Sequence, residues 1–516
     1  MPRTYLTRLI DELRAWRRWA QASPSPAPRG DAQVRADIAL VQCPIWSVDW
    51  PSLSLGFLSA SAEARGIRTA LIDISAALYS SATEEIKKYW HWDKIKFWED
   101  GRFVDLVFKR FRPEIDSYRA AVLGSGCRLI GFSVFGTSVA FSVRFAHELK
   151  SRAPRIPIVF GGHEVDKPSG RALVPRGCCD AHVVGEGEHA LIDLYRSVVE
   201  RGAIDPHIPG VIVEEGNYTP RPQTDELDDL PSPTWNGFDL HLYTSGALPL
   251  LFSRGCISRC SFCSDTAHFK RFRHRSPAHM MREIRSHVER YRVHNFRFHD
   301  LLINGDINAL NGLCDAIVSS GVEVSWTAMA MARKEMSQDQ FRRLRAAGCL
   351  ELDMGVESGS NRVLKLMRKP VTVEEIGRNI QLASQAGIKV NISLVIGHPG
   401  EEEEHVGETI EFLRRHARVI HRVNNVNHCV VTFGSDIWNH PDRYGIVLPE
   451  PLATAFYRWR SADGRNTLEL RKERQVRVLD VCRELGIPVA FANLYDGAAL
   501  DMAQARRDLG APAWAV

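Results

Sequence analysis

The sequence predicts an α/β protein with a doubly wound, Rossmann-like N-terminal domain, a partial (β/α)6 barrel and a small helical C-terminal region. Two observations predict this fold. Short apolar runs alternate with amphipathic helical segments over most of the chain, as in parallel sheets covered by helices. A proline-rich and acidic stretch, residues 219–233, divides the pattern in two. We therefore expect an N-terminal helix and linker at 1–35, domains at 36–216 and 246–440 joined by a linker at 217–245, and a C-terminal region at 441–516.

Composition narrows the classes of partner. The chain has 516 residues, enough for about three domains, and its 66 basic and 62 acidic residues give a net charge of +4. This near balance predicts neither a nucleic acid nor an anionic membrane as partner. No apolar run reaches the roughly 18 residues of a transmembrane helix, and the N-terminus resembles no secretory signal. We expect a cytoplasmic protein that acts on a small molecule.

The first domain contains five strand-like runs separated by helical patterns. In doubly wound sheets, ligands bind beyond the carboxyl ends of the strands. An insertion at 85–112 mixes aromatic with basic residues. Such a mixture can bind single-stranded nucleic acid, but we prefer amphipathic helices whose aromatic side chains pack inward. The expected strands are 38–43, 69–74, 129–134, 156–160 and 181–184, and the expected helices lie near 55–65, 139–152 and 188–201.

Three cysteines in a CxxxCxxC run, Cys256, Cys260 and Cys263, follow an apolar strand at 248–252. Structural zinc needs four protein ligands, whereas a four-iron cluster held by three cysteines leaves one iron free for a small molecule. A partial zinc knuckle is the alternative, but no further CxxC or HxxxH pair offers the missing ligands. The other eight cysteines are scattered in apolar or mixed segments, and we expect them to be buried, reduced thiols.

The second domain repeats the strand and helix alternation around this run. Six strands with helices outside predict a partial barrel whose functional residues lie at the carboxyl ends of strands. The tail is expected to be helical near Trp459, at 471–485 and at 503–509. After the first strand at 248–252, the expected strands are 296–301, 322–327, 350–355, 390–396 and 426–432, with helices near 278–290, 308–319, 337–347, 373–386 and 402–415.

The cysteine run, with Phe262 before its third cysteine, resembles the radical S-adenosylmethionine (SAM) superfamily. The resemblance implies a [4Fe-4S] cluster whose open iron chelates SAM. The F-x-D-x-x-F-x-x-N variant of the family is matched at Phe298 and Asp300, with Ile303 departing from the pattern, and a G-x-P-G-E turn is matched after the fifth strand. For Arg333 the alternative to a SAM contact is an ordinary arginine at the surface. The resemblance thus assigns SAM contacts to Phe262, Asp300, Asn304, Arg333, Glu357, Ser358, Gly397 and Gly400.

The first domain resembles the cobalamin-binding domain that precedes many radical SAM enzymes. It matches the P-x-x-x-L-G entry to the first helix, GG-H after the fourth strand and V-V-G-E-G-E after the fifth. His182 fits a DxHxxG pattern that supplies a cobalt ligand elsewhere, but it falls inside the fifth strand, so we expect no histidine ligand from it. The resemblance implies cobalamin contacts at Leu53, Ser54, Gly56, Ser133, Thr137, Gly161, Gly162, His163, Gly185, Glu186 and Gly187.

Together these resemblances imply a cobalamin-dependent radical SAM enzyme. Its cofactors are a [4Fe-4S] cluster, SAM and cobalamin, and its electrons come from an external donor of flavodoxin or ferredoxin type. Our first hypothesis is a C-methyltransferase that acts on an unactivated carbon through a 5′-deoxyadenosyl radical and methylcobalamin. The alternatives are a non-methylating oxidative cyclase or rearrangement enzyme, and a catalytically silent cobalamin sensor. No side-chain nucleophile or acid–base pair stands out, and such cofactor chemistry requires none, so no catalytic residue is assigned.

Overall fold

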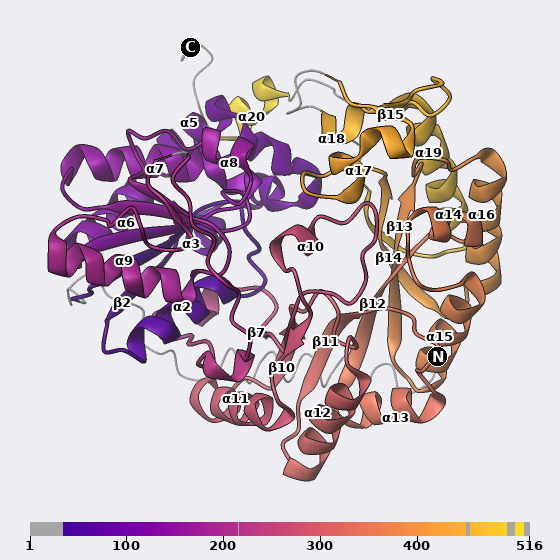
Figure 1. Cartoon of the computed structure of the whole chain (residues 1–516). Helices are drawn as coiled ribbons and strands as arrows, with labels where there is room; N and C mark the ends of the chain where they lie inside the picture. The colour runs from indigo at the N-terminus through magenta and orange to yellow at the C-terminus, as the bar shows by residue number, and fades with distance from the viewer. Residues whose placement is uncertain (1–34, 215, 450–454, 493–500, 510–516) are drawn as a thin grey trace.

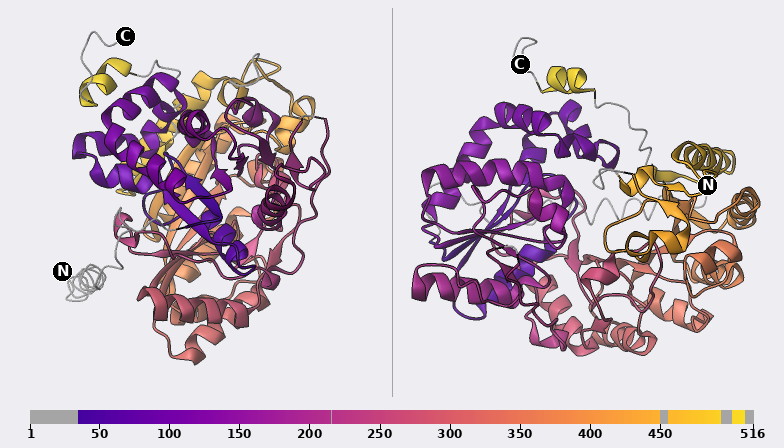
Figure 2. Two further views of the ribbon diagram at one scale, coloured as in Figure 1. Left: turned by 90° about the vertical axis from the view of Figure 1, so that its left-hand side faces the viewer. Right: turned by 45° about the horizontal axis from the view of Figure 1, so that its top comes forward.

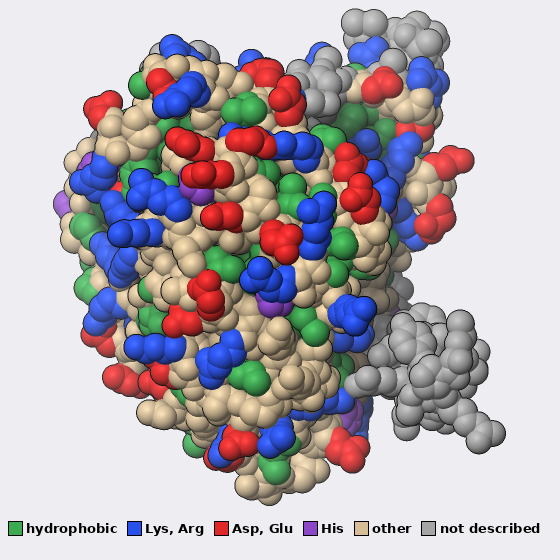
Figure 3. Space-filling view, turned by 90° about the vertical axis from the view of Figure 1, so that its right-hand side faces the viewer, with side chains coloured by type: hydrophobic (Ala, Val, Ile, Leu, Met, Phe, Trp, Pro, Cys, Tyr) green, Lys and Arg blue, Asp and Glu red, His purple; other side chains and the backbone are tan. Residues whose placement is uncertain are grey.

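A computed structural model describes residues 35–214, 216–449, 455–492 and 501–509, and it places two parallel sheets side by side (Figures 1 and 2). The predicted N-terminal helix at residues 5–20 lies outside the described residues. Helices cover the outer surfaces of both sheets (Figure 1). No helix in the described part of the chain is both long and apolar enough to cross a bilayer. Basic and acidic side chains intermingle on the face shown in Figure 3, in keeping with the small net charge.

The first sheet has the strand order β2-β1-β3-β4-β5-β6, which confirms the doubly wound prediction. Every residue of β1 and β3 is buried, as expected for central strands covered on both faces. The five predicted strands are present, and a short antiparallel edge strand, β6, is added. The strands are β1 Ile38–Gln42, β2 Thr69–Asp73, β3 Leu129–Ser133, β4 Ile158–Gly161, β5 Ala181–Val183 and β6 Val211–Ile212; the helices around them are α2 Leu53–Glu63, α3 Ile74–Ser81, η3 Gly136–Ser138, α7 Val139–Arg152, α8 Pro168–Ala172 and α9 Gly187–Arg201.

The aromatic insertion packs inward, as predicted. Its large rings are buried against the first sheet and its helices, and Trp98 is completely buried. Trp92 is the exception, with 64% of its surface exposed. Near the chain's end, Asp508 on α20 (Met502–Asp508) accepts a hydrogen bond from Tyr89 and pairs with Lys88, at 2.7 and 2.6 Å. The insertion comprises α4 Glu84–Lys87, η1 Lys88–Trp90, η2 Trp92–Glu99, α5 Gly101–Arg110 and α6 Arg112–Gly124.

The second sheet is a partial barrel of parallel strands in the order β17-β14-β13-β12-β11-β10-β7. The six predicted strands form it in sequence order, with boundaries shifted by a few residues. Its strands are β7 Leu248–Leu250, β10 Asn295–Phe298, β11 Ser325–Ala330, β12 Cys349–Glu357, β13 Lys389–Ile396, β14 Ile420–His428 and β17 Val489–Ala492; its helices are α10 Asp265–His268, α11 Pro277–Tyr291, α12 Ile307–Ser320, α13 Gln338–Ala346, α14 Asn361–Leu366, α15 Val373–Gln385, α16 Glu403–His416 and α19 Leu468–Glu484.

The seventh strand, β17, is a difference from the predicted helical tail. It pairs parallel with β14 after the long helix α19, so the tail adds one more helix and strand unit to the barrel. β17 has only four residues, none of them fully buried, and therefore carries too weak an apolar signal to be recognised in the sequence. The remaining short elements are η4 Leu227–Asp229, η5 Leu240–Leu242, β8 Ser253–Arg254, β9 Arg273–His274, α17 Asp436–Asn439, η6 Pro441–Tyr444, β15 Ile446–Val447, α18 Ala455–Arg458 and β16 Arg460–Ser461.

Contacts between the two halves bring the carboxyl ends of the two sheets together. Trp50, in the loop after β1, meets His299, directly after β10, with ring centroids 4.9 Å apart. The Asp49 side chain accepts a 2.6 Å hydrogen bond from the Thr244 hydroxyl, just before β7. Because ligands of both fold types bind at strand carboxyl ends, this junction is the place to look for a site.

Candidate cofactor site at the junction of the two sheets

The three cysteines of the CxxxCxxC run lie on one loop that leaves the short strand β8. All three are half-buried, whereas the other eight cysteines of the chain are buried, as predicted. The loop starts at Gly255, which has φ +86°; a Cβ atom there would lie 2.3 Å from the carbonyl oxygen of Arg271. Only glycine fits that position. Three accessible sulfur ligands on one loop fit the donor set of a [4Fe-4S] cluster with one open iron.

Asp300 fixes the backbone that leads into this loop. Its carboxylate accepts hydrogen bonds from the Phe252 amide at 3.1 Å and from the Ser253 amide and hydroxyl, both at 2.5 Å. Asp300 is fully buried, and burial raises the pKa of its carboxyl to about 6. Asn304 similarly pairs with the backbone of Met331, at 2.8 and 3.1 Å. Both side chains therefore position backbone next to the cluster loop, and their predicted contact with SAM stays a prediction.

Glu357 lies at the end of β12 and has a buried cationic partner, Lys369, which the sequence analysis missed. The Lys369 Nζ lies 3.3 Å from the Glu357 carboxylate. Burial opposes the charge on Lys369, but the negative charges of Glu357, Cys260 and Cys256 outweigh it and raise the pKa of the lysine. Lys369 therefore places a positive charge beside the cluster loop. In the sequence it is one of several basic residues after a short helix, with nothing to separate it from a surface lysine.

Other predicted SAM residues face different neighbours. Ser358 is buried, with its hydroxyl 3.3 Å from that of Thr409 on α16. Arg333 donates to the carbonyl oxygens of Asn304 and Gly305, both at 2.8 Å. These two side chains thus have partners within the protein, and their contact with SAM stays a prediction.

The turn after β13 packs closely against the C-terminal helix. Gly397 has φ +80°, and a Cβ atom there would lie 2.3 Å from Arg471 on α19. Gly400 also has a positive φ, +83°. On the cluster loop, Phe262 packs against the small core that contains Trp459. The turn and the loop are joined, because the Ser261 hydroxyl lies 2.9 Å from Nε2 of His398. The turn predicted to contact SAM therefore sits directly against the cysteine loop.

The carboxyl edge of the first sheet carries a hydroxyl-rich cluster. The Ser54 and Ser133 hydroxyls lie 3.1 Å apart, and Ser52 donates to the buried Gln42 at 3.2 Å. Thr137 donates to the Ile45 carbonyl at 3.1 Å, and Leu53 is half-buried. These groups come from the ends of β1 and β3 and the start of α2, where the fold class places a ligand.

Three glycines of this edge differ in their surroundings. Gly162 has φ +103°, and a Cβ atom there would lie 2.6 Å from the carbonyl oxygen of Val134, so it provides a cradle that only glycine can form. Gly161 is unstrained. A Cβ atom at Gly56 would lie 2.9 Å from the Trp235 ring, so this glycine makes room for an indole of the linker. The contacts of these residues with cobalamin stay predictions.

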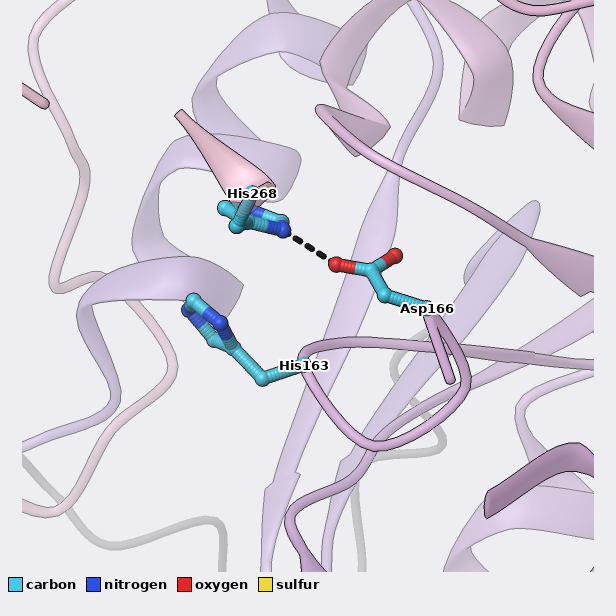
Figure 4. Close-up of side chains that lie close together, drawn as sticks. All are labelled: His163, Asp166 and His268. Atoms are coloured by element: carbon cyan, nitrogen blue, oxygen red, sulfur yellow. Dashed lines mark hydrogen bonds and ion pairs between the residues drawn. The ribbon is translucent and has the colours of Figure 1, made fainter. Parts of the chain in front are cut away.

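His163 takes part in a contact across the junction (Figure 4). Its ring contacts that of His268 on α10, with centroids 4.2 Å apart and planes tilted by 38°, and His268 Nδ1 is hydrogen-bonded to Asp166. The ligand-type atoms of these three residues lie within 4.8 Å of one another. Burial and the neighbouring His268 lower the pKa of His163 to about 4, so its ring is neutral at pH 7. Because His268 belongs to the second half and His163 and Asp166 to the first, the cluster latches the two halves together. The other oxygen of Asp166 accepts the Gly185 amide at 2.8 Å.

The Gly185-Glu186-Gly187 loop forms the second latch. The Glu186 carboxylate contacts Arg254 at 3.1 Å and Arg273 at 2.8 Å and accepts the Thr224 amide at 2.8 Å. Arg254 also pairs with Glu188. The Glu186 side chain thus contacts arginines that precede and follow the cysteine loop. A contact of the Gly185-Glu186-Gly187 loop with cobalamin stays a prediction. His182 lies within β5, as predicted, in register with Ile212 of β6.

Two buried polar atoms at the junction have no hydrogen-bond partner within the described chain: Trp50 Nε1 and His299 Nε2. Burial lowers the pKa of His299 to about 3, so its ring is neutral. Buried polar groups are rarely left unpaired, so both atoms favour a ligand between the sheets. With the Gly162 cradle and the hydroxyl cluster, they fit the requirements of a large, amide-rich cofactor such as cobalamin.

Comparison with known proteins agrees with a cluster at the cysteine loop and cobalamin at the first sheet. The family model of the radical SAM superfamily matches residues 250–413, and that of the B12 binding domain matches residues 99–194. An uncharacterized methyltransferase of Pyrococcus horikoshii is 25% identical over 61% of this chain and 68% of the relative. Cytidylyl-2-hydroxyethylphosphonate methyltransferase of Streptomyces wedmorensis is 24% identical over 67% of this chain and 69% of the relative.

Solved structures show the same architecture. The radical SAM methyltransferase TsrM from Kitasatospora setae, solved with tryptophan and a SAM analogue, has a TM-score of 0.60 and 18% identity, covering 80% of this chain and 77% of that one. Both family models, the shared fold and the junction between the sheets give the same assignment. The chain belongs to the cobalamin-binding radical SAM enzymes.

Proposed function

We propose that this protein is a methyltransferase that adds a methyl group to an unactivated carbon of a small molecule. The observation that carries the proposal is the junction itself, where the cysteine loop and the hydroxyl-rich edge of the first sheet meet. Both relatives named above are methyltransferases. When bound, the cluster and SAM supply a radical that removes a hydrogen atom, and cobalamin supplies the methyl group.

The chain's own residues then bind, orient and shield. Cys256, Cys260 and Cys263 hold the cluster, and Asp300 fixes the backbone before them. Lys369 and Glu357 place one positive and one negative charge where SAM, which carries an ammonium and a carboxylate group, is expected. The two latches, around Asp166 and Glu186, keep the two halves in contact and exclude water from the junction. Water exclusion matters because a carbon radical is readily lost to side reactions.

The inner face of the barrel supports a hydrophilic substrate. Arg297 on β10 donates to Thr327 on β11 at 3.1 Å and to Asp353 on β12 at 2.6 Å. Asn391 on β13 donates to Asp353 at 2.8 Å. Burial opposes ionisation of Asp353, but Arg297 and Asn391 outweigh it and lower the pKa of the carboxyl. The alternate residues of the same strands, including Phe296 and Leu352, belong to the apolar core, so this polar network faces the lumen.

This polar network lies on β10, β12 and β13, before the carboxyl ends of these strands. Asp353 precedes Glu357 by four residues on the same strand, a separation of about 13 Å at about 3.3 Å per residue. An alkyl chain between Asp353 and Glu357 would remove water from this polar network and offer it no hydrogen bonds in return. We therefore propose a substrate with hydrogen-bonding groups rather than a membrane lipid.

We also propose that the cluster is reduced by an external electron donor of flavodoxin or ferredoxin type, in the reducing cytoplasm. The free, buried cysteines fit a reducing compartment.

The test is anaerobic turnover with trideuteromethyl SAM. The reconstituted holoenzyme is incubated separately with the water-soluble and the lipid extracts of cells that carry this chain, and two products are measured, 5′-deoxyadenosine and labelled metabolites. We expect the water-soluble extract to stimulate SAM cleavage and to yield a product that carries the trideuteromethyl group. Stimulated cleavage with a product that loses hydrogen and gains no label would contradict methyl transfer and favour a cyclase. Labelling of a lipid would contradict the hydrophilic substrate alone.

A further inference from the structure

A basic groove lies on the outer surface behind the cysteine loop. It encloses about 400 Å³ between α14, η6 and the turn after β13. Its walls contain four cationic side chains together with Leu366, Pro399, Gly400 and Tyr444. The cations are Arg362, Lys365, Arg368 and Arg443, and all four are exposed.

The groove has an excess of positive charge. Arg368 and Arg443 share one carboxylate, that of Asp436, at 2.8 and 3.5 Å. Arg362 and Lys365 form no ion pair with another described residue, so their charges face solvent. Four cations against one carboxylate leave a local excess of positive charge in the groove. Such a patch attracts an acidic partner at close range.

The inner wall of the groove is in direct contact with the cysteine loop. Ser261, between the second and third cysteines, donates its amide to the Met367 carbonyl at 2.8 Å, directly after Leu366 of the groove. Its hydroxyl lies 2.9 Å from His398, whose ring meets Tyr444 of the groove at a centroid distance of 6.3 Å. The Ile437 amide donates to the Ser261 carbonyl at 3.0 Å. One layer of side chains therefore separates the basic groove from the residues that flank Cys260 and Cys263.

We propose that this groove is the docking surface for the acidic redox protein that reduces the cluster. The inference rests on the proposed function, because it assigns a surface to the donor proposed there. In the complex the reduced donor loses one electron and the oxidised cluster gains it; no atom or proton crosses the surface. Arg362 and Lys365 provide the unpaired charges that attract the donor, while Tyr444 and His398 bridge from the groove to the cysteine loop.

The test compares two routes of reduction in the holoenzyme. The variant Arg362→Glu with Lys365→Glu reverses the two unpaired charges, and Lys365→Glu alone is the milder version. Reduction by an acidic flavodoxin, followed as 5′-deoxyadenosine formation, is expected to slow at least 10-fold at low salt in the double variant. Reduction by dithionite, which needs no docking surface, should stay at the wild-type rate. Wild-type reduction by flavodoxin should weaken as salt is added, and the double variant should lose most of that dependence.

The chain offers a control in a second groove with cationic side chains, of about 410 Å³, lined by Asp105, Phe108, Lys109, Arg112 and Arg144. It lies over α5 and α7, on the opposite side of the molecule from α14 and α16 (Figure 1). Lys109→Glu with Arg144→Glu should leave reduction by flavodoxin unchanged. Equal slowing by both charge reversals, or none by the first, would overturn the docking surface. Loss of dithionite-supported cleavage in the first variant would also overturn it, because the groove would then serve SAM binding. Failure of the wild type with both reductants would contradict the proposed function instead.

Discussion

Glu186→Gln removes a buried carboxylate that joins the two halves of the molecule, and its cost follows from two arguments. Burial raises the pKa of Glu186, but Arg273, Arg254 and the Thr224 amide outweigh it, and the net pKa falls from 4.5 to about 2. This lowering of the pKa corresponds to about 3 kcal/mol of stability at neutral pH. Removing one partner of a buried ion pair costs about 3–5 kcal/mol, which agrees. We expect the variant to lose about 3 kcal/mol.

The pH dependence has a definite sign. Because the folded pKa lies below the unfolded value, the contribution of Glu186 is complete above about pH 4.5 and is lost as the pH falls toward 2. The difference between wild type and variant should therefore shrink from about 3 kcal/mol at pH 7 to about 1 kcal/mol at pH 3.

Thermal unfolding at pH 7 provides the assay. A loss of about 3 kcal/mol in a domain of about 200 residues lowers the Tm by about 6–12 °C. The matched control is Asp225→Asn, since Asp225 pairs with Arg271 in the same region but both side chains are largely exposed, 70% and 60%. That variant should change stability by less than about 1 kcal/mol. If Glu186→Gln unfolds within 1 °C of the control, the latch does not stabilise the junction and the reasoning fails.

Three further substitutions test the site. Gly162→Ala should destabilise the first domain by at least about 2 kcal/mol and abolish cobalamin retention in gel filtration, because the backbone φ is +103° and the new Cβ would meet a carbonyl oxygen at 2.6 Å. The control is Gly66→Ala, where φ is +73° but the space is open. It should cost about 1 kcal/mol and retain cobalamin. Cys260→Ala should lose the absorption band of the cluster yet bind cobalamin as the wild type does; joint loss of both cofactors would contradict separate sites. Lys369→Met should lower the free energy of urea unfolding by about 3 kcal/mol, because it leaves the Glu357 carboxylate buried without its cation; an unchanged midpoint would show that Glu357 is solvated.

Features with a local sequence signature could be predicted. The CxxxCxxC loop, the position of His182 inside a strand and the inward packing of the aromatic insertion each depend on residues close together in the chain. β17 could not be predicted, because four residues at a sheet edge, three half-buried and one exposed, give little periodic signal. Spacing alone located the cysteine run and the glycine turns, but could not reveal which side chains they face.

The partners of buried polar groups could not be predicted from the sequence either, because the two residues of each pair are far apart in the chain. Asp300 meets the backbone of Ser253, and Glu186 meets Arg254, pairs separated by 47 and 68 positions in the chain. Motif matching placed Asp300 near SAM and Glu186 near cobalamin. Only the fold shows that one carboxylate holds the backbone before the cysteine loop and the other latches the domains. Lys369 has no motif at all, and its role follows only from its burial beside Glu357.

The central claim is that one chain holds a four-iron cluster and cobalamin at adjoining edges of its two sheets. The most direct test is anaerobic reconstitution with iron, sulfide and hydroxocobalamin, followed by absorption and electron paramagnetic resonance spectra with and without SAM. The account predicts one cobalamin per chain and a reducible cluster whose signal changes when SAM is added. A cluster without cobalamin would contradict the site assigned to the first sheet, and the lack of any SAM-sensitive cluster would contradict the account as a whole.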